Sequence, residues 1–223
     1  MLQLPTVLVL GGLALLFAAI AWYLRGRAQL RADLRAGYFA AVAPEFSNLR
    51  QAVADTGFPR LSGVWQGDTF DLQAVPDTLT FRKLPALWLL VTLPAPQPVR
   101  GTLDMLLRPM GTEPFTHFMQ LPTQIATPPG FPPEAVLRCD DPTALPPAEL
   151  VARHVAGLDK TRLKELVISP KGLRLVWLME EADRTRYLIF RDAEMGANAL
   201  PPAQLRPLLT ALQSLRDDLS ETA

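Results

Sequence analysis

The feature that most constrains this chain is an uncharged apolar run of twenty-one residues close to its N-terminus. The run extends from Leu4 to Leu24 and has the sequence LPTVLVLGGLALLFAAIAWYL. At about 1.5 Å per residue, a helix of this length reaches roughly 30 Å, which is the thickness of a bilayer's hydrocarbon core. The run therefore predicts a single transmembrane helix over residues 4–24, preceded by a short tail at residues 1–3.

A cleaved signal peptide and a buried core helix are the alternatives to an uncleaved anchor. A signal peptide begins with basic residues and has a shorter apolar segment, whereas residues 1–3 carry no basic side chain. The run ends in Trp22 and Tyr23, which is typical of an interfacial aromatic belt. Alanines near its end keep cleavage open, but a core helix is rarely apolar all round at this length. The pattern favours an uncleaved anchor.

Orientation follows from four arginines that come directly after the run, which we call the arginine collar: Arg25, Arg27, Arg31 and Arg35. Positive charge close to a span stays on the cytoplasmic side. We therefore expect the N-terminus outside and the rest of the chain in the cytoplasm. The excess of arginine over lysine suits a bacterial protein, so the expected location is the bacterial inner membrane. The collar is either a topology signal alone or also a site for anionic headgroups of the bilayer.

Small residues recur along one side of the predicted span at spacings of three and four, at Gly11, Ala14, Ala18 and Ala21. Small side chains let transmembrane helices approach closely and associate. This face predicts self-association or docking on a membrane protein partner, although ordinary alanine and glycine content explains the pattern equally well.

Composition limits the remaining function classes. The net charge of the 223 residues is zero, so no overall basic field indicates a nucleic-acid partner. The one cysteine, Cys139, excludes an internal disulfide. After the anchor and a basic neck at residues 25–45, residues 46–223 are long enough for one cytoplasmic domain with a core.

The elements expected in that domain are groups of strands and helices without strict alternation. A helical neck over residues 25–42 ends at Pro44, and residues 46–57 form a short amphipathic helix. Tight turns then join strands that resemble an antiparallel meander, and these expected strands cover residues 61–66, 69–75, 78–82, 87–93 and 101–108. A hairpin is expected over residues 166–168 and 173–179, and a further strand at residues 186–191. Helices are expected at residues 148–157 and 202–220. The predicted fold class is α+β, with helices packed on antiparallel sheet.

The proline- and phenylalanine-rich stretch at residues 109–135 is the least regular part of the sequence. A loop of this length inside a compact domain is usually functional or disordered. Its phenylalanines argue against full disorder. We expect an ordered loop laid over the domain, with a partner groove as the alternative.

Motifs for catalysis are weak. His154 falls on the apolar side of its expected helix, His117 lies between aromatic residues, and Cys139 matches no nucleophile signature. No metal-ligand spacing, phosphate-binding loop or nucleophile elbow is present in the sequence. We therefore predict no catalytic, metal or cofactor site.

Three hypotheses for function remain. The first is a single-pass, membrane-tethered interaction or scaffold domain at the inner membrane surface. The second is an anchored, hydrolase-like enzyme of undefined substrate. The third is a lipid-binding module in which residues 25–35 and a groove of the domain hold headgroups or acyl chains.

Overall fold

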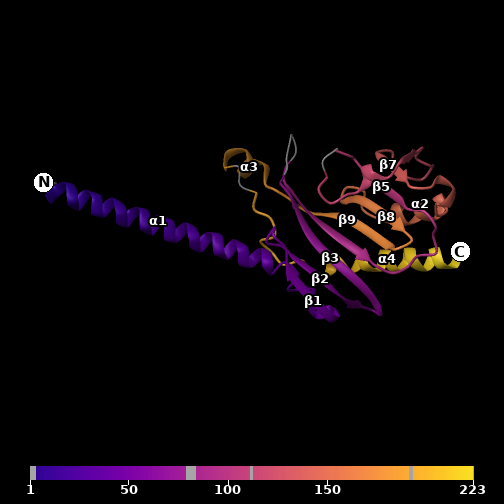
Figure 1. The fold of residues 1–223 in the computed structure, drawn as a ribbon, viewed down its shortest axis with the longest axis horizontal. Coiled ribbons are helices and arrows are strands. Elements are labelled where there is room, and N and C mark those ends of the chain that lie inside the picture. Colours follow the sequence, from indigo (N-terminus) through magenta and orange to yellow (C-terminus); the bar gives the residue numbers. More distant parts are fainter. Residues whose placement is uncertain (1–3, 79–83, 111–112, 191–192, 223) are drawn as a thin grey trace.

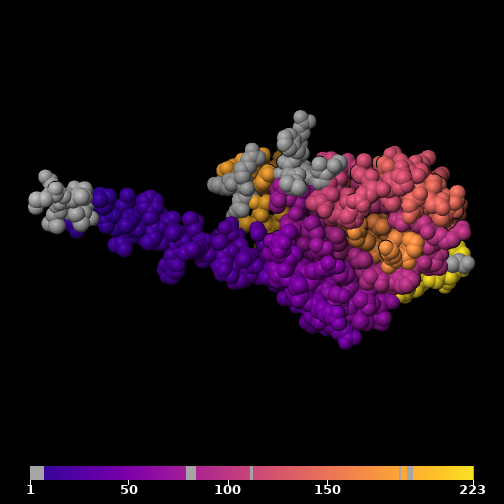
Figure 2. All heavy atoms as spheres, in the orientation of Figure 1, coloured from indigo at the N-terminus to yellow at the C-terminus, as the bar shows by residue number. Residues whose placement is uncertain are grey.

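The structure is a computed structural model that describes residues 4–78, 84–110, 113–190 and 193–222. A single helix, α1 (Leu4–Ala36), projects from a sheet domain (Figure 1). Its side chains from residue 8 onward are exposed over the apolar part, and Figure 2 shows α1 standing clear of the domain over most of its length. Within the described residues, one helix is long and apolar enough to cross a membrane, over Leu8–Ala36.

The domain is built on one antiparallel sheet that has nine strands within the described residues. Their spatial order is β1-β2-β3-β4-β9-β8-β5-β7-β6. The strands are β1 (Ser47–Val53), β2 (Pro59–Trp65), β3 (Asp68–Asp77), β4 (Ala86–Leu93), β5 (Leu103–Leu107), β6 (Thr123–Ile125), β7 (Ala135–Cys139), β8 (Leu163–Ser169) and β9 (Gly172–Glu181). The predicted α+β class is confirmed, with antiparallel sheet, packed helices and one candidate membrane span.

One face of the sheet, which we call the inner face, carries the main core. Alternate residues of each strand point to it, because successive side chains of a strand lie on opposite faces. The helices α2 (Ala148–Ala156) and α4 (Pro202–Thr222) cover this face. The leucine stripe expected on the last helix is buried there: Leu205, Leu208, Leu209, Leu212, Leu215 and Leu219.

The opposite, outer face carries a row of mostly polar residues that runs straight across the sheet. Strand register places Thr92 opposite Arg174, Arg174 opposite Val167, and Val167 opposite Asp104. The row continues through Asp71 at one end and Arg138 at the other. Beside it lies a small apolar cluster of Ala86, Trp88, Leu90, Phe115 and Val176.

The junction between α1 and the domain has no flexible linker. The helix ends at Ala36 rather than near Pro44, because Tyr38, Phe39 and Val42 turn into the core. The backbone carbonyl of Tyr38 accepts a hydrogen bond from the N–H of Leu200, 2.7 Å away. The chain therefore passes from the candidate span into the hydrophobic core within a few residues.

Two element types were wrongly predicted. Residues 46–57 contain strand β1, not an amphipathic helix, since this stretch pairs with β2 and leaves Leu49 and Val53 exposed. Residues 186–191 were expected as a strand, but the structure has helix α3 (Arg184–Phe190). Short apolar runs fit either element, so their periodicity alone does not distinguish them.

The predicted connections also need correction. The turn between β2 and β3 is Gln66-Gly67, one residue earlier than expected, with φ of 48° and 91°, the positive pair that tight hairpins favour. Strand β3 continues through Pro76 and Asp77 instead of turning there. Strand β5 is not next to β4, because β9 and β8 lie between them. Most of the strand expected at residues 78–82 lies outside the described residues.

Candidate functional site

An open cavity of about 460 Å³ lies on the outer face, beside the turn between β8 and β9. We call it the Asp104 pocket. Its lining comes from the polar row, from that turn and from the segment before β6, and comprises Thr92, Pro94, Thr102, Asp104, His117, Gln120, Leu121, Val167, Ser169, Lys171, Gly172, Leu173 and Arg174.

Two buried carboxyl groups lie in and next to this pocket. Asp104 on β5 is 3% exposed and Glu165 on β8 is fully buried. Glu165 accepts a hydrogen bond from the Thr116 hydroxyl, and one from the Arg174 guanidinium at 3.2 Å. Among the described residues, Oδ1 of Asp104 has no hydrogen-bond partner. One guanidinium therefore faces two carboxyl groups.

Burial shifts the pKa values of both carboxyl groups. Burial and the negative charge of Glu165 raise the pKa of Asp104 to about 8, although the positive charge of Arg174 opposes the shift. Burial also raises the pKa of Glu165, where Arg174 opposes the shift. Removing a carboxylate from water without a full set of partners favours its neutral form. Burial therefore favours the protonated form of the Asp104 carboxyl, and such a perturbed group in a cavity marks a candidate functional site.

The segment from residue 113 to residue 122 forms one wall of the pocket. Phe115 packs against Trp88 with ring centroids 5.3 Å apart. Nε of Arg138 donates to the carbonyl of Leu121 at 2.7 Å, and its guanidinium lies 5.9 Å from the ring of Phe118. These contacts hold the wall on the outer face, where we expected an ordered loop.

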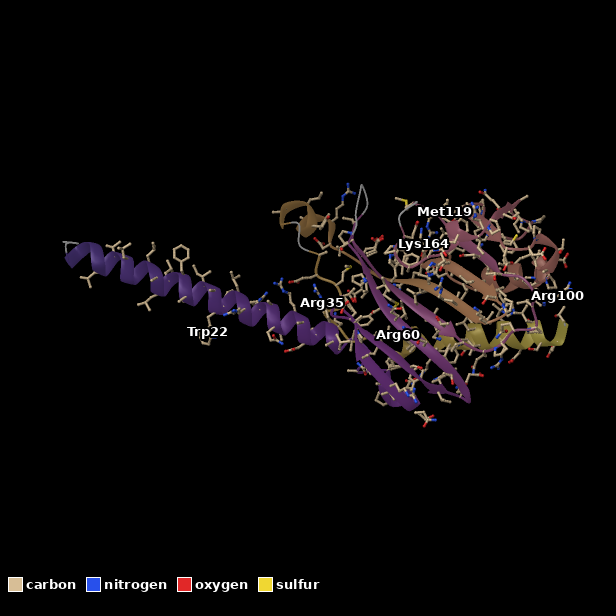
Figure 3. The ribbon with its side chains drawn as sticks, in the orientation of Figure 1. Trp22, Arg35, Arg60, Arg100, Met119 and Lys164 are labelled. Atoms are coloured by element: carbon tan, nitrogen blue, oxygen red, sulfur yellow. The ribbon has the colours of Figure 1, made fainter. Side chains whose placement is uncertain are left out.

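A buried ion pair fixes the start of this wall. Nζ of Lys164 lies 3.0 Å from Oε1 of Glu113, and both side chains are almost completely buried. The same ammonium group donates to the carbonyls of Leu107 and Arg108 at 2.9 and 2.7 Å. The end of β5 and the beginning of the wall are thereby joined through one side chain, which Figure 3 labels.

At the rim of the pocket, the exposed side chains of Lys171 and His117 add polar groups. Nδ1 of His117 is 3.1 Å from the amide nitrogen of Gln120. Within the described residues, no three His, Cys, Asp or Glu side chains are grouped so that they could hold a metal ion.

The predicted helix-association face is exposed on α1 at all four of its residues, Gly11, Ala14, Ala18 and Ala21. The association therefore stays a prediction.

The arginine collar is partly engaged with the domain. A nitrogen of Arg31 lies 3.8 Å from Glu194, and the Arg35 guanidinium lies 5.9 Å from the ring of Phe58. Arg27, Arg31 and Arg35 line a cavity of about 160 Å³ together with residues 194–197.

His154 and Cys139 have structural surroundings. Nε2 of His154 on α2 lies 2.9 Å from Oδ2 of Asp218 on α4, so this side chain links the two helices of the inner face. Cys139 is fully buried in β7, and burial raises the pKa of its thiol. A raised pKa disfavours the thiolate that a nucleophile requires.

Sequence reasoning missed Asp104, Glu165 and Arg174. A signal for them exists, because each is a charged residue inside a strand that is otherwise apolar, as in LDMLL and LKELVIS. Charged residues are almost never fully buried unless they are paired. That rule singles out these strands as places where a polar cluster forms.

Comparison with known proteins finds no family model that matches the chain, and no curated protein or solved structure that is similar to it.

Proposed function

We propose that this protein is a membrane-tethered interaction domain whose binding site is the Asp104 pocket. In this proposal, α1 crosses the bacterial inner membrane once with the N-terminus outside, and the sheet domain lies at the cytoplasmic surface. The observation that carries the proposal is a buried carboxyl group, Asp104, that lines an open cavity and has an oxygen without a partner in the described chain. Buried polar groups in folded proteins normally have partners, and a bound group would supply one.

The charges of the pocket favour a cationic group as the occupant. Asp104 and Glu165 both face the half-buried guanidinium of Arg174. An incoming ammonium or guanidinium group would provide the second positive charge, and Asp104 would release its proton to pair with it. A lysine or arginine side chain of a protein partner has this chemistry and fits the tethered location.

The binding proposal is tested in cells that express the full chain, with a photo-crosslinking amino acid in place of Gln120 at the pocket. Gln204, an exposed glutamine on α4, is the matched control position. We expect a discrete adduct from position 120 that is absent from position 204 and falls several-fold with Asp104→Asn. Asp71→Asn, on the same polar row, should leave it unchanged. Equal adducts at both positions, or no effect of Asp104→Asn, would contradict the proposal.

Topology is tested separately by protease treatment of spheroplasts. A tag on the N-terminus should be cut from outside, while the sheet domain stays protected until the membrane is broken. The opposite pattern would overturn the orientation. Loss of the N-terminal tag from the mature protein, together with release of the domain, would indicate a cleaved signal peptide.

An anchored enzyme is a second candidate, and the same carboxyl group favours it. A pKa of about 8 at Asp104 lies in the range in which a group donates and accepts protons at neutral pH. In that case Asp104→Asn would abolish turnover of a small molecule. Position 120 would give no protein adduct, either with Asp104 or with Asn at position 104.

A further inference from the structure

The short helix α3 exposes two adjacent large apolar side chains. Leu188 is 58% exposed and Ile189 is 65% exposed. Figure 1 shows that α3 is the described part of the sheet domain that reaches furthest back along α1, toward its N-terminal end. An apolar pair on an exposed helix is unfavourable in water, and α3 lies on the side of the sheet domain from which α1 projects (Figure 1).

The segment that follows α3 holds this region against α1. Glu194 lies 3.8 Å from Arg31, and Met195 is buried in the main core. The N–H of Gly196 donates to Glu180 at 2.9 Å. A Cβ at Gly196 would lie 2.4 Å from the ring of Phe58, so this backbone is packed as closely as it can be. Residues 194–196 are thus fixed to the sheet domain, and Glu194 joins them to α1.

The arginines of α1 near residues 194–197 supply positive charge for an anionic surface, whereas Glu181 and Asp183, which precede α3, and Glu194, which follows it, are acidic. Arg27, Arg31 and Arg35 repeat at intervals of four on α1, and all three line the same cavity beside residues 194–197. Arg184 begins α3 and is exposed. Exposed apolar side chains with basic residues around them are the composition with which helices lie in a bilayer surface that contains anionic lipid.

We propose that α3 is a second membrane contact, and that its occupant is the surface of an anionic phospholipid bilayer. Leu188 and Ile189 enter the boundary between headgroups and acyl chains, while the arginines of α1 lie among headgroup phosphates. The proposal rests on the proposed function to the extent that α1 crosses a membrane. It adds that the sheet domain touches the bilayer directly at the side formed by α3.

The test measures the lipid contact of single positions in the full chain, reconstituted in vesicles of equal parts phosphatidylglycerol and phosphatidylcholine. Cysteine replaces Ile189, Met119 or Phe17 in separate variants and is labelled with an environment-sensitive fluorophore. Cys139 is fully buried, and the unsubstituted chain serves as the labelling blank. Met119 is the matched control, since it is 72% exposed and lies beyond α3 along the molecule from Trp22 (Figure 3). Quenching by spin-labelled lipids then reports contact with the bilayer.

We expect the label at position 189 to be quenched several-fold more than the label at position 119, and less when phosphatidylcholine is the only lipid. Equal quenching at positions 189 and 119 would overturn the proposal. Position 17 lies in the middle of the predicted span, so a label there that is not quenched would instead refute the membrane anchor. Strong quenching at 17 without quenching at 189 would refute α3 alone.

A protein occupant gives a different result. In that case the label at position 189 is shielded from a water-soluble quencher in native membranes but not in the protein-free vesicles described above. That outcome would assign α3 to a protein partner and overturn the lipid contact. Adding Leu188→Asp to the variant labelled at position 189 should reduce quenching there, and Leu188→Asp should leave quenching at position 17 unchanged.

Discussion

The two faces of the sheet are covered in different ways, and the difference locates the site. On the inner face, α2 and α4 pack leucines into a continuous apolar core. On the outer face, the cover is an irregular segment held by hydrogen bonds and by the ion pair of Lys164 and Glu113. An apolar stripe fills its interface completely, whereas the irregular cover leaves a cavity with desolvated charges beneath it. The face with the weaker apolar packing is the one that carries the candidate chemistry.

The largest expected effect comes from breaking the ion pair that holds the outer cover. Lys164→Met should lower the free energy of unfolding by about 3–5 kcal/mol, because Glu113 would remain buried without its partner charge. Urea unfolding of the full chain in detergent, followed by tryptophan fluorescence, measures it. The double variant Lys164→Met and Glu113→Gln is the control and should lose less. A loss below about 1 kcal/mol in the single variant would contradict a role for this pair in fixing the cover.

The next largest loss of stability is expected from truncating a leucine of α4, which covers the inner face. Leu212→Ala on α4 removes a fully buried side chain and should cost about 2–5 kcal/mol in the same unfolding experiment. Leu121→Ala, in the half-buried wall of the Asp104 pocket, is the matched leucine and should cost much less. Similar losses in both variants would show that the inner and outer faces of the sheet are packed equally well, which would contradict the difference between them.

The protonation of Asp104 gives a pH-dependent prediction. Its pKa in the folded protein is about 8, above the value near 3.9 that an unfolded chain has. The folded state therefore binds more protons between these values, and its stability falls as pH rises through this range. Asp104 contributes a slope of at most about 1.4 kcal/mol per pH unit. Asp104→Asn should flatten the slope between about pH 5 and 7, and an unchanged slope would show that Asp104 is not the group that titrates.

The smallest effect is expected at the exposed end of the same polar row. Arg60 and Asp71 form an ion pair at 2.8 Å, with 59% of the arginine side chain exposed. Solvent screens such a pair, so Arg60→Ala should change stability by only about 0.2–1 kcal/mol. A loss as large as that of Lys164→Met would mean that the outer face is not divided into a solvated and a desolvated part.

Elements with strong local signals could be predicted from the sequence. The α4 leucines repeat at helical spacing over about four turns, and the turn at Pro170 and Lys171 joins two strands of clear composition. The class of fold followed from these elements. The order of the strands did not, because no local pattern says that β8 and β9 insert between β4 and β5. That arrangement depends on contacts between residues far apart in the chain.

The candidate site was largely hidden from the sequence for the same reason. Asp104 is far along the chain from Glu165 and Arg174 and becomes their neighbour only through the strand register. The stretch at residues 109–135 was predicted as an ordered loop over the domain, but neither strand β6 within it nor the residues that it contacts were predicted. Strand β1 and helix α3 were missed because pairing and exposure, rather than periodicity, decide which form a short apolar segment takes.

The junction at Tyr38 and Phe39 has a mechanical consequence. A span that crosses a bilayer tilts when the hydrocarbon layer is thinner than its apolar length. Because the chain enters the core directly after α1, without a hinge to absorb the rotation, the sheet must turn with the helix. A change in bilayer thickness would then move the opening of the Asp104 pocket toward or away from the headgroups. Access to the pocket would in this way depend on the surrounding membrane.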